Sequence, residues 1–308
     1  FLLALASPSL LPAEPLTVYT VNYPLQYFTQ RIAGDHARVI FPAPPDVDPA
    51  FWMPDRKTIG DYQRADLILL NGAAYARWVS KASLPRLRLV DTSRAFRDDL
   101  VAVRDTVTHH HGPAGEHSHT GTAFTTWLDF HQAVQQAQAI VDALSRKQPE
   151  HRSEFEKNFA SLHSELMTLD QTLRQTVAVN PDQRLFASHP VYQYLARRYD
   201  LRIEDMVWEP DEMPDDQQWQ RLRLVHESFP ADWMLWEKQP LPDIAQQLDA
   251  MGIGIAVFDP CANRPASGDF LSVMRENITV LGRTYASKAT PRGQAASPVV
   301  PVKPAVEY

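Results

Sequence analysis

Four ionisable residues in the second half of the chain each follow a short apolar run: His189, Glu209, Glu237 and Asp259. The runs cover residues 184–189, 201–209, 233–237 and 253–259, and segments with helical character separate them. This alternation predicts the strands of a parallel α/β sheet. Because ligands bind outside the carboxyl ends of such strands, we expect one imidazole and three carboxylates to converge on one crevice. That set suits a divalent cation or a cationic ligand, and charged strand ends on an ordinary surface are the alternative.

The first half of the chain shows the same alternation. Strands are expected at residues 16–22, 37–41, 67–71 and 87–91, with helices at 23–32 and 54–64. Each half is therefore predicted to form a lobe built on a four-stranded parallel sheet, which places the chain in the α/β class.

A long amphipathic helix is predicted between the two lobes. Residues 130–145 and 150–179 both have helical character, and in the second segment apolar residues recur at spacings of three and four. This stripe comprises Phe155, Phe159, Leu162, Leu166, Leu169 and Leu173. About thirty helical residues extend roughly 45 Å, which is enough for a rigid spine along a two-lobed molecule. A coiled-coil partner helix is the alternative.

The pattern divides the chain into a signal-peptide remnant at 1–13, an N-terminal lobe at 14–148, an interlobe helix at 149–180, a C-terminal lobe at 181–285 and a flexible tail at 286–308. The apolar start resembles a secretory signal without its basic region and is too short to span a bilayer, so we expect an exported, soluble protein. A frayed apolar terminus is the alternative. The net charge of −7 argues against nucleic-acid binding, and the single Cys261 excludes an internal disulfide and a thiolate zinc cluster.

A histidine-rich loop is expected at residues 106–122, without regular structure. Its histidines are His109, His110, His111, His117 and His119. Neutral imidazole is the commonest metal ligand, and a flexible cluster can wrap Zn²⁺, Cu²⁺ or Ni²⁺. Because ordering the loop costs backbone entropy, such a loop is better suited to collecting or sensing metal than to holding it rigidly. A solvated loop without a metal role is the alternative.

Several short motifs carry a resemblance that covers Leu16 to about Tyr285. They are residues 21–25, the Pro-Pro-Asp-Val-Asp-Pro loop at 44–49, the strand at 65–72, Trp-Leu-Asp at 127–129, the Ser-His-Pro-Val-Tyr motif that opens 188–199, and Phe-Asp-Pro at 258–260. In these the chain resembles the periplasmic solute-binding proteins of zinc and manganese ABC transporters, the ZnuA/TroA-like group. The resemblance implies a cluster A-I-type fold whose long interlobe helix limits closure. It also implies metal ligation by His189 and Asp259.

Two positions depart from the family pattern. The resemblance implies a histidine ligand where this chain has Ala50 and another where it has Thr125, and neither replacement is a good zinc ligand. Candidate replacements are Glu237 and Glu209 at neighbouring strand ends, His117 or His119 from the loop, and Asp46 or Asp48. Asp48, Trp52, Thr125 and Trp127 are expected to line the cleft. Trp52, Trp127, Trp208 and Trp236 lie beside the ligand positions, so a chelated metal or an organic cation is a second possible cargo, and core packing is the alternative for these rings.

The resemblance thus predicts a monomeric periplasmic receptor that delivers a divalent metal to the membrane subunit of an ABC permease. Zn²⁺ is the expected cargo, with Mn²⁺ or another divalent metal as alternatives. A metal–chelate or organic-cation receptor and a periplasmic metal chaperone or buffer that acts through the histidine loop are the competing functions, and a metallochaperone is a further candidate partner. An enzyme is not expected, because the sequence contains no nucleophile motif, no phosphate-binding glycine loop and no His-Glu-x-x-His motif.

Overall fold

Two four-stranded parallel sheets form the two lobes of the protein in a computed structural model that describes residues 14–45, 47–103, 108–111, 115–118 and 121–286. The N-terminal sheet has the order β2-β1-β3-β4 and the C-terminal sheet the order β10-β9-β11-β12. The strands are β1 (Leu16–Thr20), β2 (Ala37–Ile40), β3 (Leu67–Leu70), β4 (Leu89–Asp91), β9 (Arg184–Ala187), β10 (Arg202–Asp205), β11 (Trp233–Trp236) and β12 (Gly254–Val257). The α/β prediction with two parallel four-stranded sheets is therefore confirmed.

Helices connect successive strands within each lobe, as the parallel order requires. The N-terminal lobe contains α1 (Tyr23–Ala33) and α2 (Arg56–Arg64), and the C-terminal lobe contains α5 (Gln193–Tyr199), α6 (Asp216–Ser228) and α7 (Pro242–Ala250). Side-chain caps begin several of these helices: Asn22 accepts from the Leu25 N–H, and Asp55 accepts from the Thr58 N–H. Asp215 and Gln218 form a reciprocal capping box at α6, so each start follows from local sequence.

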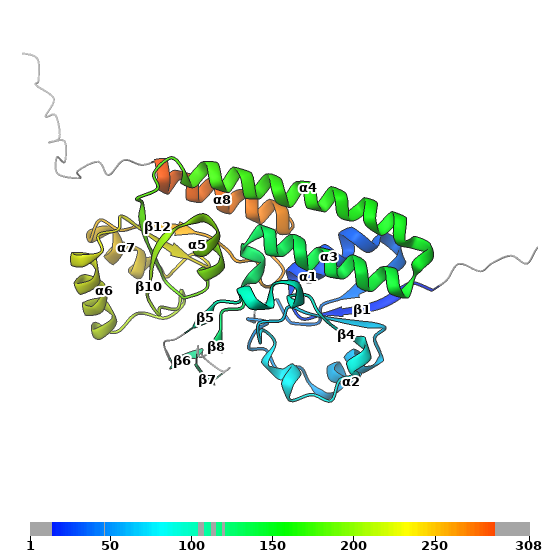
Figure 1. Cartoon of the computed structure of the whole chain (residues 1–308). Helices are drawn as coiled ribbons and strands as arrows, with labels where there is room; N and C mark the ends of the chain where they lie inside the picture. Colours follow the sequence, from blue (N-terminus) through cyan, green and yellow to red (C-terminus); the bar gives the residue numbers. More distant parts are fainter. Residues whose placement is uncertain (1–13, 46, 104–107, 112–114, 119–120, 287–308) are drawn as a thin grey trace, which may run out of the picture.

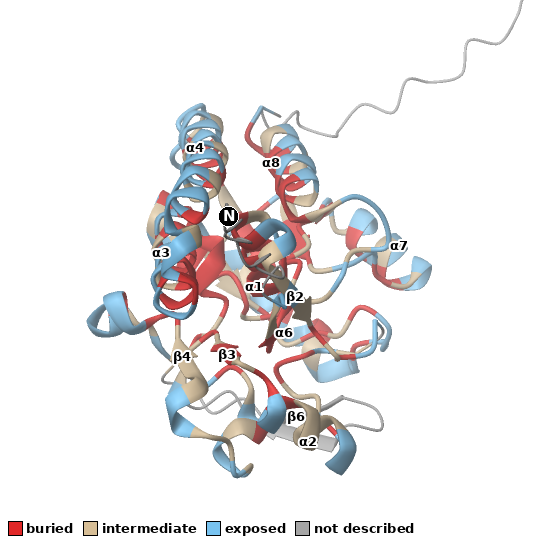
Figure 2. Ribbon diagram, turned by 90° about the vertical axis from the view of Figure 1, so that its right-hand side faces the viewer, coloured by how far each residue is buried: buried red, intermediate tan, exposed pale blue. Residues whose placement is uncertain are grey.

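Three helices lie along the top of the molecule, and the longest of them, α4, spans both lobes (Figure 1). They are α3 (Phe130–Lys147), α4 (Arg152–Val177) and α8 (Phe270–Ala286). The 26 residues of α4 extend about 39 Å, and of the predicted stripe all but Phe159 are buried. Figure 2 shows this asymmetry, with the inward faces of α3 and α4 buried and their outward faces exposed. No helix among the described residues combines the length and the apolar character that a membrane crossing needs.

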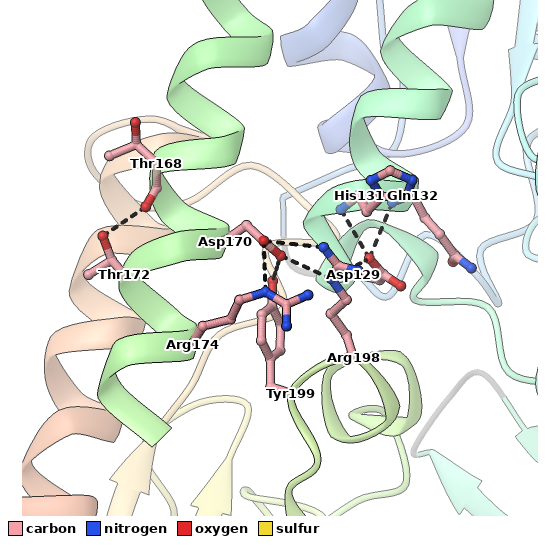
Figure 3. Close-up of polar contacts among 9 residues, drawn as sticks. All are labelled: Asp129, His131, Gln132, Thr168, Asp170, Thr172, Arg174, Arg198 and Tyr199. Atoms are coloured by element: carbon pink, nitrogen blue, oxygen red, sulfur yellow. Dashed lines mark hydrogen bonds and ion pairs between the residues drawn. The ribbon is translucent and has the colours of Figure 1, made fainter. Parts of the chain in front are cut away.

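A buried carboxylate ties the spine to both lobes (Figure 3). Asp170 of α4 accepts hydrogen bonds from Arg198 Nε at 3.0 Å, Arg174 Nε at 3.0 Å and the Tyr199 hydroxyl at 3.0 Å. Arg198, on α5, also lies 3.5 Å from Asp129, which caps α3. The network therefore joins a helix of each lobe to α4 between them.

The structure differs from the sequence predictions in two segments. β10 ends at Asp205, so Glu209 lies on the loop that follows the strand and not at the strand end. The histidine-rich segment contains paired strands β6 (Thr108–His111) and β7 (Gly115–Ser118), with His109 opposite His117, and β5 (Ala102–Val103) pairs with β8 (Gly121–Thr122). The expectation of no regular structure is wrong for these described residues, because their backbones pair in two antiparallel ladders. His119, Asp46, the signal-like start and the tail beyond Ala286 lie outside the described residues.

Candidate metal-binding cleft

His189 is the centre of a charged cluster on the C-terminal lobe. It lies two residues beyond β9 and is buried, with Nδ1 3.1 Å from Glu237 Oε1 and Nε2 3.6 Å from Glu209 Oε1. Burial lowers the pKa of His189, but the hydrogen bond and charge of Glu237, with the charges of Glu209 and Asp48, outweigh burial and raise it. The crevice thus favours positive charge on the imidazole, as it would favour a bound cation.

Asp259 is held by its own loop and by the C-terminal helix. Its Oδ1 accepts from the Cys261 N–H at 2.7 Å, while Asn277 of α8 makes two hydrogen bonds to the Asp259 backbone. Burial raises the pKa of Asp259, and the negative charge of Glu237 raises it further. Two repelling carboxylates in a desolvated crevice are stabilised when a cation lies between them.

The two family histidine positions are buried on the N-terminal side of the interlobe crevice. Ala50 is 1% exposed, and its N–H donates to Asp48 Oδ1 at 2.8 Å. Thr125 is 3% exposed, and its hydroxyl donates across the lobes to the Val191 carbonyl at 2.5 Å. Neither side chain can take the place of an imidazole ligand. The alanine side chain has no atom that can bind a metal, and the threonine hydroxyl is already used in the hydrogen bond between the lobes.

Asp48 and Tyr75 bring oxygen atoms of the N-terminal lobe to this crevice. Tyr75 is 1% exposed, and its hydroxyl has no hydrogen-bond partner among the described residues. Burial raises the pKa of Tyr75, and the negative charges of Asp48 and then Glu237, one from each lobe, raise it further. A buried phenol hydroxyl without a hydrogen-bond partner destabilises the folded protein, and a bound ligand would supply that partner.

Sequence reasoning missed Tyr75 and Asp205. Tyr75 follows β3 through three residues with positive φ, namely Gly72, Ala73 and Ala74. Alanine rarely adopts a positive φ, and strained backbone of this kind is common at functional sites. No sequence motif predicts such a conformation here. Asp205 was missed because β10 was expected to continue to Glu209. Burial, with the charge of Glu204, raises the pKa of Asp205 to about 7, and the positive charge of His189 opposes this rise.

A cavity of about 250 Å³ opens between the lobes, and its lining does not include His189, Glu209, Glu237 or Asp259. Its lining includes Phe124 and Thr125 from one lobe and Pro190 and Val191 from the other. Arg77 also lines it, with its guanidinium 4.8 Å above the Phe51 ring. The interlobe space at this point is therefore large enough for water or a small ligand.

The tryptophans do not form an open aromatic cage. Trp127 has no exposed surface and donates its indole N–H to the Pro260 carbonyl at 2.7 Å, so it joins the lobes from within and does not line an open cleft. Trp208 and Trp236 are buried in the C-terminal core, where burial of large rings is the ordinary outcome. Of the four tryptophans expected beside the ligand positions, only Trp52 is half-buried, and it packs against the main core.

A comparison with known protein families identifies the family of this chain. The family model described as "Zinc-uptake complex component A periplasmic" (ZnuA) matches residues 18–284. The chain belongs to this family. The match spans both lobes and the spine, so the resemblance inferred from the motifs is confirmed.

Relatives with known names share about a quarter of their aligned residues with this family member. The zinc-binding lipoprotein AdcA of Streptococcus pneumoniae is 25% identical over 281 residues, which cover 87% of this chain and 56% of AdcA. The high-affinity zinc uptake system protein ZnuA of Bacillus subtilis is 27% identical over 214 residues, or 65% of this chain and 64% of that protein. The chain therefore spans little more than half the length of AdcA.

Solved structures agree on the fold. The metal-dependent lipoprotein YcdH of Bacillus subtilis superposes with a TM-score of 0.74 at 22% identity, over 87% of this chain and 98% of that one. Zn(II)-bound AdcA of Streptococcus pneumoniae gives the same TM-score and identity over 89% of this chain and 58% of that one. This likeness establishes the two-lobed ZnuA-type fold.

Proposed function

We propose that this protein is the periplasmic solute-binding component of a metal ABC transporter and that it captures a divalent metal, zinc, in the interlobe crevice. Family membership and the names of the zinc-binding relatives support this function. The single observation that carries it is the placement of His189 between Glu237 and Glu209, where a buried imidazole is surrounded by carboxylates. The metal is the cargo, and the membrane subunit of the permease is the partner that receives it.

The donor set that we propose differs from a set of imidazoles. His189 and Asp259 supply the C-terminal ligands, and Glu237 or Glu209 completes that side. The Tyr75 phenol or Asp48 approaches from the other lobe, since Ala50 and Thr125 supply nothing. Carboxylate oxygen is a harder ligand than imidazole, so this set should discriminate less strongly between Zn²⁺ and Mn²⁺ than a three-histidine site.

Calorimetric titration of the full chain with Zn²⁺ and with Mn²⁺ tests the proposal. The His189→Ala and Asp259→Ala variants should each bind at least tenfold more weakly in the crevice, because each removes a ligand. Deletion of residues 106–122 should leave the tight crevice site intact, and His163→Ala, which changes an exposed histidine on α4, is the matched control. Unchanged binding in both crevice variants, or binding that vanishes with the loop, would refute the crevice as the cargo site.

A further inference from the structure

A second cluster of metal-ligating side chains lies at the end of the N-terminal sheet that is opposite the crevice. His36 ends η1 (Gly34–His36) directly before β2, His151 ends η7 (Pro149–His151), and Glu154 lies in the first turn of α4. One ligand atom from each of the three lies within 4.8 Å of the other two. Because His36 precedes its strand, the cluster sits at the amino ends of the strands, whereas the crevice lies outside their carboxyl ends.

Direct contacts already draw the three side chains together. His36 Nε2 lies 2.9 Å from Glu154 Oε2, and the two imidazole rings stack with centroids 3.8 Å apart and planes 25° apart. The edge-to-face ring of Phe155 supports both imidazoles, at 5.7 Å from His36 and 6.2 Å from His151. Phe155 is itself buried in the core, so the two histidines rest on a fixed wall.

A glycine turn and a hydrogen bond between two helices hold the backbone around the cluster. Gly34 ends α1 with φ of 54°, a conformation that glycine adopts without strain, and the chain turns there to bring His36 back to α4. Asn158 of α4 donates to the Ile32 carbonyl at 3.0 Å, which docks the spine on the end of α1. Two elements distant in sequence are thus fixed where their ligand atoms meet.

The local charge is compatible with a cation. The N-terminus of α4 carries partial positive charge, which by itself would repel a metal ion. The carboxylates of Glu150 and Glu154 offset it, and the nearby Arg152 is directed to Glu156 at 2.9 Å. Side-chain exposures of 24% for His36, 30% for His151 and 54% for Glu154 leave one side of the cluster open to solvent.

We propose that His36, His151 and Glu154 form a second divalent transition-metal site, separate from the crevice. Two imidazoles and one carboxylate are a known ligand set of open zinc sites, in which water completes the tetrahedron. Bond lengths of about 2.1 Å place tetrahedral ligands roughly 3.4 Å apart. The ligand atoms that lie furthest apart, at up to 4.8 Å, must therefore approach, while His36 Nε2 and Glu154 Oε2, which lie 2.9 Å apart, must separate slightly. The stacked rings must also rotate apart until their lone pairs converge, and the metal takes the place of the direct contact between His36 and Glu154.

Zinc alone, added to the full chain, tests this site in two ways. Crystals soaked with Zn²⁺ should show an anomalous peak between the three side chains. Calorimetry at micromolar zinc should show one equivalent fewer for His36→Gln and for Glu154→Gln than for His163→Gln, which changes an exposed histidine on the same helix. Glu154→Gln alters an exposed side chain, so it remains informative if His36→Gln fails to fold.

Two results would overturn the proposal. One is equal zinc stoichiometry in Glu154→Gln and in the His163→Gln control. The other is anomalous density at the crevice or elsewhere with none between His36, His151 and Glu154. Because His189→Ala and Asp259→Ala leave this cluster intact, the equivalent assigned to it should survive in both, so failure here is distinguishable from failure of the crevice proposal.

Discussion

Substitution of Asp170 by alanine should destabilise the protein strongly, because this carboxylate joins the spine to both lobes. Its side chain is 5% exposed and accepts from Arg174, from Tyr199 and twice from Arg198. In the variant, Arg174 can turn to water because it is 48% exposed, whereas the Tyr199 hydroxyl stays buried. Breaking a buried ion pair by removing one partner costs about 3–5 kcal/mol.

The geometry places the expected loss near the lower end of that range. Arg198 keeps a second carboxylate, Asp129, at 3.5 Å, so its charge is not stranded. We therefore expect the free energy of unfolding to fall by about 3 kcal/mol, which for a chain of this size lowers Tm by about 5 °C. Urea denaturation followed by circular dichroism measures the change.

Arg152→Ala is the matched control, since Arg152 also pairs with a carboxylate four residues away on α4. Its pair with Glu156 is exposed on both sides, so the loss should be about 0.5 kcal/mol or less. A change in Asp170→Ala no larger than in this control would refute the reasoning.

Measuring stability at low pH tests the role of Asp170 a second time. Burial alone would raise the pKa of Asp170, but hydrogen bonds from Arg198, Arg174 and Tyr199 outweigh it and lower the pKa. A depressed pKa means that this contribution is present above the unfolded value of about 3.9 and is lost as pH falls through the folded value. The stability gap between wild type and Asp170→Ala should therefore narrow in acid.

Two further predictions concern the crevice. The raised pKa of His189 means that zinc affinity should fall as pH drops through the folded pKa of this imidazole, which lies above about 6.5. The same group stabilises the metal-free protein below about pH 6.5 and loses that contribution as pH rises through its folded pKa. Calorimetry and thermal melts on both sides of that pKa should show these opposite trends, and parallel trends would contradict them. Tyr75→Phe should leave stability unchanged or raise it by about 1 kcal/mol, because its hydroxyl is buried without a partner, and should weaken zinc binding severalfold. Tyr192→Phe, which loses a hydrogen bond to the Phe258 carbonyl, should instead lose about 1 kcal/mol, and equal effects in both variants would count against a ligand role for Tyr75.

The strand pattern and the spine were predictable because they depend on short-range periodicity. Short apolar runs marked the eight strands of the two sheets, and the stripe on α4 marked its buried face. The convergence of His189 and Glu237 followed from one topological rule, that carboxyl ends of parallel strands share an edge. The absence of a ligating side chain at Ala50 was likewise visible in the sequence alone.

The sequence by itself thus determined the α/β class, the two-lobed architecture, the family and the residue types available at the strand ends. Tertiary structure decided how those residues are used, because pairing between distant segments depends on packing that no local pattern encodes. Only the folded chain shows that Thr125 bonds across the lobes to Val191, and that the phenol of Tyr75 is buried without a partner. It also brings His36 to Glu154 across more than a hundred residues, through a glycine turn and a helix docked on the end of another.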